Sequence, residues 1–147
     1  MDTLRPYTLM DRDACLRIFD SNVPRYFDPL ERDKFARFLL APVGSYFVVE
    51  RHAHVLACGG YLVLSPPSVA ELTWGMVDCA HQGSGLGKYL TVARLDAMKT
   101  IPEVLQAYIN TSQRVQGFYE GLGFNHTRVK RDGHGKGLDS VEMHLKL

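Results

Sequence analysis

The sequence has little excess charge and no long hydrophobic run. Its formal net charge is +1 at pH 7, which gives no reason to expect a nucleic acid or an anionic membrane as a partner. No apolar stretch is long enough to span a bilayer, and Arg5, Asp11, Arg12 and Asp13 interrupt the apolar run that a signal peptide would need. These absences predict a soluble, cytoplasmic protein without a nucleic-acid or membrane partner.

Cysteine is also scarce. The three cysteines, Cys15, Cys58 and Cys79, lack the spacing of metal ligands, and an odd number of them favours reduced thiols over a disulfide framework. His52 and His54 could share one face of a strand, but two isolated imidazoles near a predicted turn are more typical of solvated side chains than of a metal site. We therefore expect no metal.

What is present is the composition of one globular domain. Hydrophobic residues make up 46% of the chain and charged residues 22%, which is ordinary for a soluble globular protein. A length of 147 residues is enough to bury a proper core. No linker, repeat or low-complexity run divides the sequence, so we expect a single domain over residues 1–147.

Hydrophobic periodicity and turn residues predict an alternation of strands and helices. The predicted strands cover residues 3–9, 46–51, 54–64, 69–78, 104–111, 125–131 and 140–147, and the predicted helices cover residues 11–21, 29–40, 86–99 and 113–122. Asp11 is expected to cap the first helix, and Pro29 suits the start of the second, with Leu30 on its inner face. The strand, helix and strand between residues 69 and 111 imply a right-handed crossover between parallel neighbours.

The most informative segment is QGSGLGK, Gln82 to Lys88, which joins a predicted strand to a predicted helix. Three glycines within five positions lack Cβ atoms, so that successive backbone N–H groups can converge on one ligand. The following helix adds its unpaired first-turn donors and the positive end of its dipole. The segment therefore predicts a turn that binds an anion, most simply a phosphate.

Two common phosphate loops do not fit this spacing. A nucleoside-triphosphate loop needs four residues between its first glycine and Gly-Lys, followed by Ser or Thr, whereas Gly83 and Gly87 enclose only three and Tyr89 follows Lys88. A dinucleotide-binding fingerprint would need a third glycine where Lys88 stands. A glycine-rich turn that merely joins strand to helix remains the structural alternative.

Two phrases resemble the GCN5-related N-acetyltransferase (GNAT) superfamily. Gln82, any two residues, Gly85, any residue and Gly87 are similar to its pyrophosphate-binding signature. Residues 118–124, FYEGLGF, resemble the phrase with which many members end their last helix and enter the next strand. That phrase is also coherent physically, because an apolar helical face stops at Gly123 and a new apolar run begins at Phe124.

The resemblance implies a mixed α/β (α+β) fold, with a centrally splayed β-sheet of about seven strands flanked by four helices. It also implies acetyl-CoA as a cosubstrate, with its pantetheine arm against the strand before the loop and its pyrophosphate on the loop. The residues that the resemblance assigns to cofactor binding are Met76, Val77, Gln82, Gly83, Ser84, Gly85, Leu86, Gly87, Lys88, Asn110 and Ser112.

Two parts of this assignment depart from the pattern or have alternatives. Members usually carry Asn seven residues before the tyrosine of the second phrase, whereas this chain has Ser112 there and Asn110 two positions earlier. Met76 and Val77 could be plain core residues as well as cofactor contacts. Gly75, inside the same strand, predicts a bulge or a close backbone approach.

The implied reaction is acetyl transfer to a primary amine of a small molecule or a peptide, by direct attack in a ternary complex. The amine must first lose a proton, because an alkylammonium group has a pKa near about 10. Glu71 resembles the base of histone-acetylating members, although a water path, or a plain charged residue at a strand edge, is the alternative. Tyr119 resembles the general acid that protonates the departing thiolate, and a packed core aromatic is its alternative.

Other readings of the whole chain also stay open. A non-catalytic, coenzyme A-binding regulatory protein and a structural domain with a coincidental loop are both compatible with the sequence. The acceptor is expected between the first two helices and the final hairpin, where acidic residues could attract a cationic amine or simply cap helices: Asp20, Asp28, Glu31 and Asp33. The sequence fixes neither the acceptor, nor an acyl group other than acetyl, nor the choice between monomer and homodimer.

Overall fold

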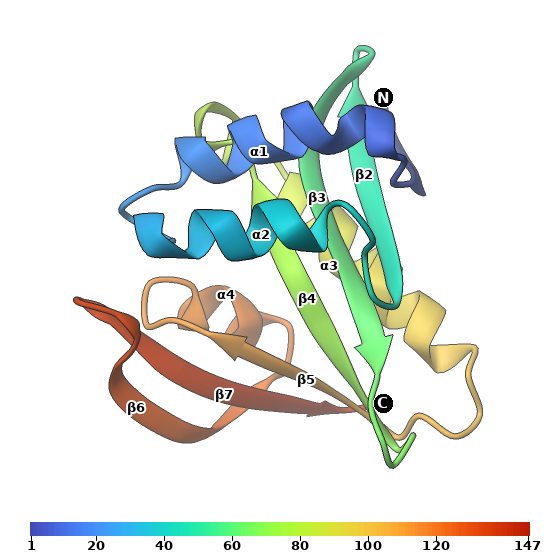
Figure 1. Cartoon of the computed structure of the whole chain (residues 1–147). Helices are drawn as coiled ribbons and strands as arrows, with labels where there is room; N and C mark the ends of the chain where they lie inside the picture. Colours follow the sequence, from blue (N-terminus) through green and yellow to red (C-terminus); the bar gives the residue numbers. More distant parts are fainter.

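The computed structural model describes all 147 residues, and its centre is a mixed sheet with helices on both faces (Figure 1). The strands are β1 (Asp2–Pro6), β2 (Ser45–Arg51), β3 (His54–Val63), β4 (Val69–Val77), β5 (Gln106–Thr111), β6 (Asn125–Gly135) and β7 (Leu138–Lys146), in the order β1-β2-β3-β4-β5-β7-β6. The helices are α1 (Arg12–Ser21), α2 (Arg32–Phe38), α3 (Leu86–Lys99) and α4 (Gln116–Gly121). The predicted mixed α/β (α+β) fold with seven strands and four helices is confirmed.

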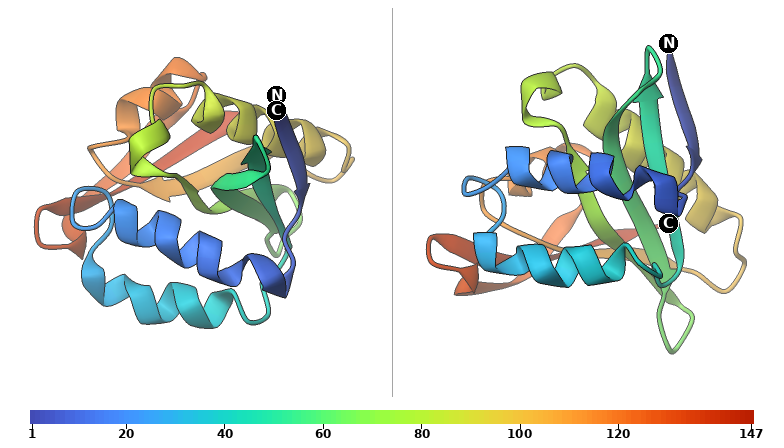
Figure 2. Two further views of the ribbon diagram at one scale, coloured as in Figure 1. Left: turned by 90° about the horizontal axis from the view of Figure 1, so that it is seen from above. Right: turned by 45° about the horizontal axis from the view of Figure 1, so that its top comes forward.

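The helices divide between the two faces of the sheet. Figure 2 shows α1 and α2 together on one face and α3 and α4 on the other. Under α1 and α2 lies a core that includes Phe19, Phe35 and Leu39, whereas Leu95 of α3 and Tyr119 of α4 belong to the core on the opposite face. Each face of the sheet therefore has its own layer of buried apolar side chains.

The sheet splits near its middle. Neighbouring strands pair antiparallel except for β4 and β5, which pair in parallel only at Val69–Gln106, Ala70–Ala107 and Glu71–Tyr108. Beyond these three pairs the strands diverge into the V visible in Figure 1. Because β4 continues to Val77, its edge on the β5 side has no strand partner from Leu72 onward. The predicted parallel neighbours and central splay are confirmed.

A bulge lies on the open part of β4. The pairing of β3 with β4 shifts register between Gly60–Thr73 and Cys58–Met76, so Trp74 and Gly75 form the bulge. The predicted irregularity at Gly75 is confirmed, although the residue with left-handed backbone is Trp74, at φ 40°.

Two contacts hold Trp74 in this strained conformation. Its carbonyl accepts a hydrogen bond of 2.8 Å from the hydroxyl of Tyr46, and its ring packs against Phe35 with centroids 4.9 Å apart. A bulky residue adopts such a backbone only where its surroundings determine it. The bulge is therefore built from the packing between the sheet and α2.

Several predicted element ends were wrong. The first strand ends at Pro6, because Leu9–Asp11 forms a 3₁₀ turn. The Asp11 side chain does not cap α1, because its carboxylate accepts from the backbone N–H of Thr8 at 2.9 Å and from Arg5 at 2.8 Å. The last helix begins at Gln116, since the backbone from Ser112 onward forms a turn first.

The second helix also differs from its prediction. Pro29–Glu31 forms a separate 3₁₀ turn before α2, and this turn places Leu30 in solvent with 88% of its surface exposed. The expected inner position of Leu30 was therefore wrong, whereas Phe35 and Leu39 are buried as predicted. None of the helices combines the length and hydrophobicity that crossing a membrane requires.

Candidate active site

The glycine turn lies at the open end of the splay, directly before α3. Gly83 and Gly85 have φ values of +77° and +89°, which side chains with a Cβ rarely adopt. A methyl group built at either position would meet no atom within 4 Å, so the space above the turn is open. Helix N-termini with such accessible backbone donors are suited to anions.

The end of the glycine turn packs against both sides of the splay. A methyl group at Gly87 would lie 3.6 Å from the side chain of Val77 in β4 and 3.7 Å from that of Phe118 in α4. Lys88 lies in the first turn of α3, is exposed and forms no ion pair. The turn, the end of β4 and the start of α4 therefore form one continuous region.

The polar side chains of the turn bond mainly to the protein itself. Gln82 donates from Nε2 to Asn22 Oδ1 at 2.7 Å, and Asn22 donates from Nδ2 to the carbonyl of Val77 at 2.9 Å. The Ser84 hydroxyl donates to a backbone carbonyl three residues earlier. These bonds tie the turn to the end of α1 and to β4, so Gln82 and Ser84 shape the loop.

The apolar residues assigned to cofactor binding are largely buried. Met76 packs into the core under α1 and α2, and Leu86, the first residue of α3, is buried against the sheet with Val49 and Ala57. Their side chains are thus core residues, whereas the backbone of Met76 and Val77 lies on the part of β4 that has no β5 partner. The sequence analysis missed Asn22, only 3% exposed, because one polar residue after an amphipathic helix is not a distinctive signal.

Glu71 marks the point where the two central strands part. It is the last β4 residue paired with β5, and its neighbours Ala70 and Leu72 point into the core under α3 and α4. Because side chains alternate along a strand, Glu71 points to the opposite face, where α2 lies. Burial raises the pKa of its carboxyl group, and the nearby charge of Lys34 partly offsets this rise.

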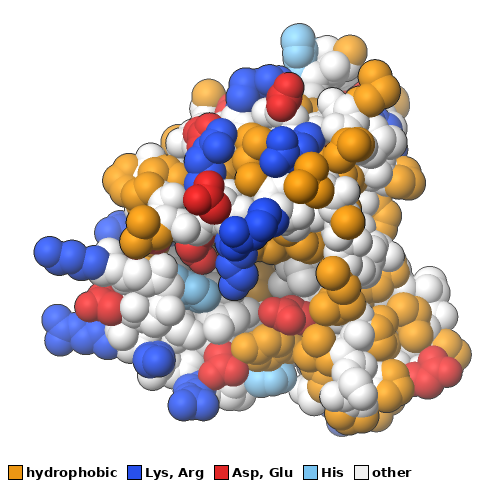
Figure 3. Space-filling view, in the orientation of Figure 1, with side chains coloured by type: hydrophobic (Ala, Val, Ile, Leu, Met, Phe, Trp, Pro, Cys, Tyr) orange, Lys and Arg blue, Asp and Glu red, His pale blue; other side chains and the backbone are white.

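Polar side chains from β5 and the final hairpin lie on the same face of the sheet as Glu71. Tyr108, directly opposite Glu71, donates its hydroxyl to Glu142 at 2.9 Å. Asn110 accepts from the hydroxyl of Ser140 at 2.8 Å and lies 2.9 Å from the ring nitrogen of His134. Figure 3 shows acidic and histidine side chains below the helical layer on this side of the molecule. Asn110 thus belongs to the same face as Glu71.

The acidic residues predicted near the acceptor have structural partners in part. Asp28 accepts from the backbone N–H of Leu30 at 2.8 Å, and Asp20 pairs with Arg32 at 2.8 Å. Glu31 is different, because burial raises the pKa of its carboxyl group.

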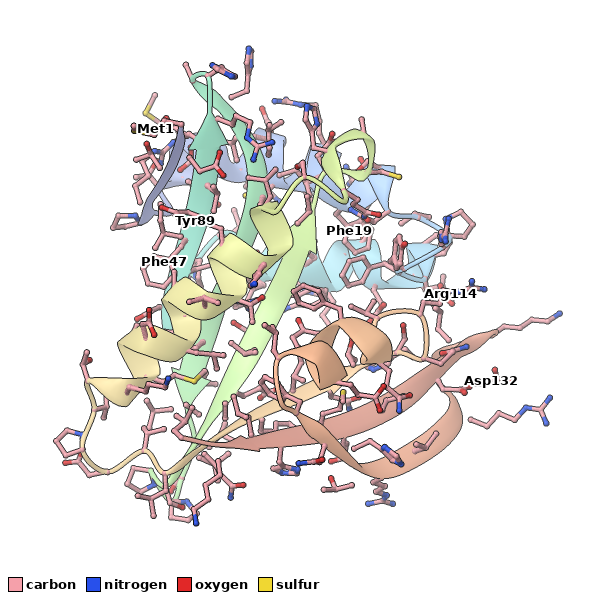
Figure 4. The ribbon with its side chains drawn as sticks, turned by 180° about the vertical axis from the view of Figure 1, so that it is seen from behind. Met1, Phe19, Phe47, Tyr89, Arg114 and Asp132 are labelled. Carbon is pink, nitrogen blue, oxygen red and sulfur yellow. The ribbon has the colours of Figure 1, made fainter.

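Tyr119 lies on the other side of the splay. It is 5% exposed, and its ring packs edge-on against Phe118 at 5.1 Å and Phe124 at 5.4 Å. The predicted helix stop at Gly123 has φ +98°, which returns the chain to the sheet. Figure 4, seen from behind, shows α3 and α4 on this same face of the sheet. Tyr119 and Glu71 therefore approach the splay from opposite faces.

Ser112 follows the last residue of β5 and begins the turn into α4. Ser112 is buried, and its hydroxyl stabilises the turn into α4 by accepting a hydrogen bond of 3.3 Å from the backbone N–H of Arg114.

A cavity of about 390 Å³ lies between α1, the turn that joins β2 to β3 and the start of the glycine loop. Its basic residues are Arg17, Arg51, His52, His54 and His81. Two of these are already paired, Arg51 with Asp2 and His81 with Asp78. No three potential metal ligands come together anywhere in the chain.

Solved structures share this architecture. A protein from Desulfovibrio desulfuricans assigned to the GNAT acetyltransferases has a TM-score of 0.83 at 19% identity, with 99% of each chain covered. Ribosomal-protein-S18-alanine N-acetyltransferase from Escherichia coli has a TM-score of 0.82 at 20% identity and covers 99% of this chain and 94% of its own. A protein from Salmonella typhimurium assigned as an acetyltransferase, solved with its cofactor acetyl-CoA, has a TM-score of 0.78 at 19% identity. The match covers 100% of this chain and 94% of that protein. At these identities the likeness shows the fold.

No curated protein matches this sequence, but a family model does. A family model, the acetyltransferase (GNAT) domain, matches residues 28–147, which include the splay, the glycine turn and the FYEGLGF segment. The chain therefore belongs to the GNAT acetyltransferase family.

Proposed function

We propose that the protein is an N-acetyltransferase that transfers acetyl from acetyl-CoA to a primary amine of a small molecule or a peptide. The observation that carries this proposal is the β4–β5 ladder that stops at Glu71–Tyr108, with the glycine turn and Tyr119 on one side of the gap and Glu71 on the other. Residues 1–147 act as one domain, because β1 and α1, which precede the matched range, complete the same sheet and core.

The cofactor site proposed here uses the backbone more than the side chains. The pyrophosphate would be held by the backbone N–H groups of the turn at Gly83, Gly85 and Gly87, with Lys88 as the nearby unpaired cation. The pantetheine arm would lie along the unpaired edge of β4. Open space above Gly83 and Gly85 fits a ligand at this place. Asn110 fits the acceptor side better, since it is bonded to Ser140 on the face of Glu71.

Glu71 is proposed as the base. Its pKa is raised by burial, which makes the carboxylate a better proton acceptor than an exposed one. The amine nitrogen then attacks the thioester carbonyl, a C–N bond forms and the C–S bond breaks. The amine proton leaves to Glu71, directly or through water.

Tyr119 is proposed as the acid that gives its hydroxyl proton to the departing sulfur. Its neighbour Phe118 is 3.7 Å from a methyl group built at Gly87, which also lies 3.6 Å from Val77 of β4, and this place in α4 supports the assignment. The carboxylates of Glu31, Glu71 and Glu142 on the acceptor face favour an amine that arrives as a cation. Among proteins with this fold, one is named for the alanine of a ribosomal protein and another for an aminoglycoside, so both peptides and small molecules belong in a screen.

The test combines a binding and a turnover measurement on the whole chain. Coenzyme A should raise the unfolding temperature by mass action, and acetyl-CoA should be consumed in the presence of at least one member of a panel of amines and amino-terminal peptides. Binding without transfer to any acceptor would favour the coenzyme A-binding regulator instead. Absence of any thermal shift by coenzyme A would refute the proposed cofactor site.

A further inference from the structure

Arg94 is a buried cation without an anionic partner. It lies in the third turn of α3, is 1% exposed and takes part in no ion pair. Its guanidinium donates to the carbonyl of Gly60 at 3.1 Å and to the hydroxyl of Thr91 at 3.3 Å, while its Nε has no partner. Burying an unpaired charge opposes folding, so a residue of this kind requires an explanation beyond packing.

Two glycines make room for this guanidinium at the splay. A methyl group built at Gly75 would lie 2.9 Å from Nη2 of Arg94, and one built at Gly59 would lie 3.1 Å from its Nη1. Gly75 belongs to the bulge on the open edge of β4, beyond the last pair with β5. Thr91, which accepts from Arg94, donates in turn to the carbonyl of Gly87 in the glycine turn at 2.8 Å. The Arg94 guanidinium is thus held next to the open edge of β4 and is linked through Thr91 to the glycine turn.

Tyr119 lies near this charge, because its neighbour Phe118 is 3.7 Å from a methyl group built at Gly87, the residue whose carbonyl Thr91 bonds. Burial raises the pKa of the Tyr119 phenol, and Arg94 is the one charged group whose proximity lowers it. Tyr46, the other tyrosine that Arg94 influences, is occupied by its hydrogen bond to the carbonyl of Trp74. A tyrosine that donates its proton becomes a phenolate, and a buried phenolate needs an opposite charge close by.

We propose that Arg94 is a positioning residue for acetyl transfer, which acts through Tyr119 by stabilising the negative charge that appears when Tyr119 gives up its proton. As the C–S bond breaks, its electron pair stays on sulfur and sulfur takes the Tyr119 proton. The guanidinium stabilises the resulting phenolate and keeps its own protons, until solvent reprotonates the oxygen. This inference rests on the proposed function, because it needs a departing thiolate.

The test is a double-mutant cycle on turnover. Arg94→Met keeps the length of the side chain and removes the charge, Arg94→Lys keeps the charge, and Tyr119→Phe removes the acid. In the parent, Arg94→Met should lower kcat by about tenfold or more with the KM for acetyl-CoA nearly unchanged, and Arg94→Lys should recover most of the loss. In the Tyr119→Phe background, Arg94→Met should change kcat by less than about threefold.

The possible results distinguish a failure of this inference from a failure of the proposed acetyltransferase function. Equal losses from Arg94→Met in both backgrounds would show a merely structural role and overturn the inference while leaving the transferase activity in place. A parent protein that neither binds coenzyme A nor acetylates any amine would overturn the proposed function and the inference with it. Arg94→Gln replaces Arg94→Met in the same cycle if the apolar variant does not fold.

Discussion

The glycine turn offers a prediction in which one charge is the only variable. Gly85→Asp and Gly85→Asn introduce side chains of nearly equal size at a position with φ +89° and no atom within 4 Å of a new Cβ. Asn and Asp tolerate left-handed backbone better than other residues with a side chain, so both variants should fold with a similar strain of about 1 kcal/mol. Their difference in coenzyme A affinity then measures the charge alone.

The size of that difference follows from Coulomb's law. A carboxylate about 5 Å from one phosphate charge, at an effective dielectric constant of about 20, is repelled by about 3 kcal/mol. The turn is exposed to solvent and salt, which we expect to remove up to half of this repulsion. Coenzyme A should therefore bind Gly85→Asp roughly 10- to 100-fold more weakly than Gly85→Asn.

Calorimetric titration of coenzyme A into both variants, at low and at high salt, is the assay. The gap between Asp and Asn should narrow as salt rises, because mobile ions screen the repulsion. Gly121→Ala is the matched control, since Gly121 lies at the end of α4, outside the turn, and a methyl group there would meet no atom within 4 Å, so this variant should bind like the parent. Equal affinities of the Asp and Asn variants at low salt would refute a phosphate site at this turn.

Three further predictions concern single side chains. Tyr119→Phe should lower turnover by on the order of 10² or more with little change in acetyl-CoA affinity, and a parallel loss of affinity would contradict the acid role. Glu71→Gln should lower turnover most at neutral pH. Burial raises the pKa of the Glu71 carboxyl group in the folded protein. This group therefore contributes stability below its unfolded pKa, and the contribution is lost as pH rises through the raised folded pKa. In chemical unfolding at pH 7, the Gln variant should be at least as stable as the parent. Asp11→Asn should lose about 1.5–3 kcal/mol at pH 7. The hydrogen bonds from Arg5 lower the pKa of Asp11, so this difference should vanish as acid titrates Asp11 through its lowered pKa; an equal deficit at low pH would point to packing instead.

The element order was predictable because it depends on short-range patterns. Alternating strands, glycine stops and the QGSGLGK turn each leave a mark within about ten residues of sequence. Element ends were less predictable. A 3₁₀ turn at Pro29–Glu31 uses the same residues as a first α-helical turn but rotates Leu30 into solvent, and no local pattern separates the two.

The residues that complete the candidate site were beyond prediction for a different reason. Arg94 in a helix looks like an ordinary exposed cation, and it becomes a buried charge only because Gly59 and Gly75, from two other strands, leave room for it. Asn22 likewise gains its role from a carbonyl 55 residues away. Such contacts depend on the tertiary arrangement, which a single sequence does not reveal.

The chain contains one tryptophan, and its place gives the protein a built-in optical probe. Trp74 lies in the bulge of β4, among the rings of Phe27, Phe35 and Phe38, at the edge that a ligand entering the gap would touch. Tryptophan fluorescence therefore reports on this one point, because the chain has no other indole. A ligand bound in the gap should shift the emission wavelength and change the intensity of the Trp74 fluorescence. Binding can therefore be followed in real time on the unlabelled protein, before any acceptor is known.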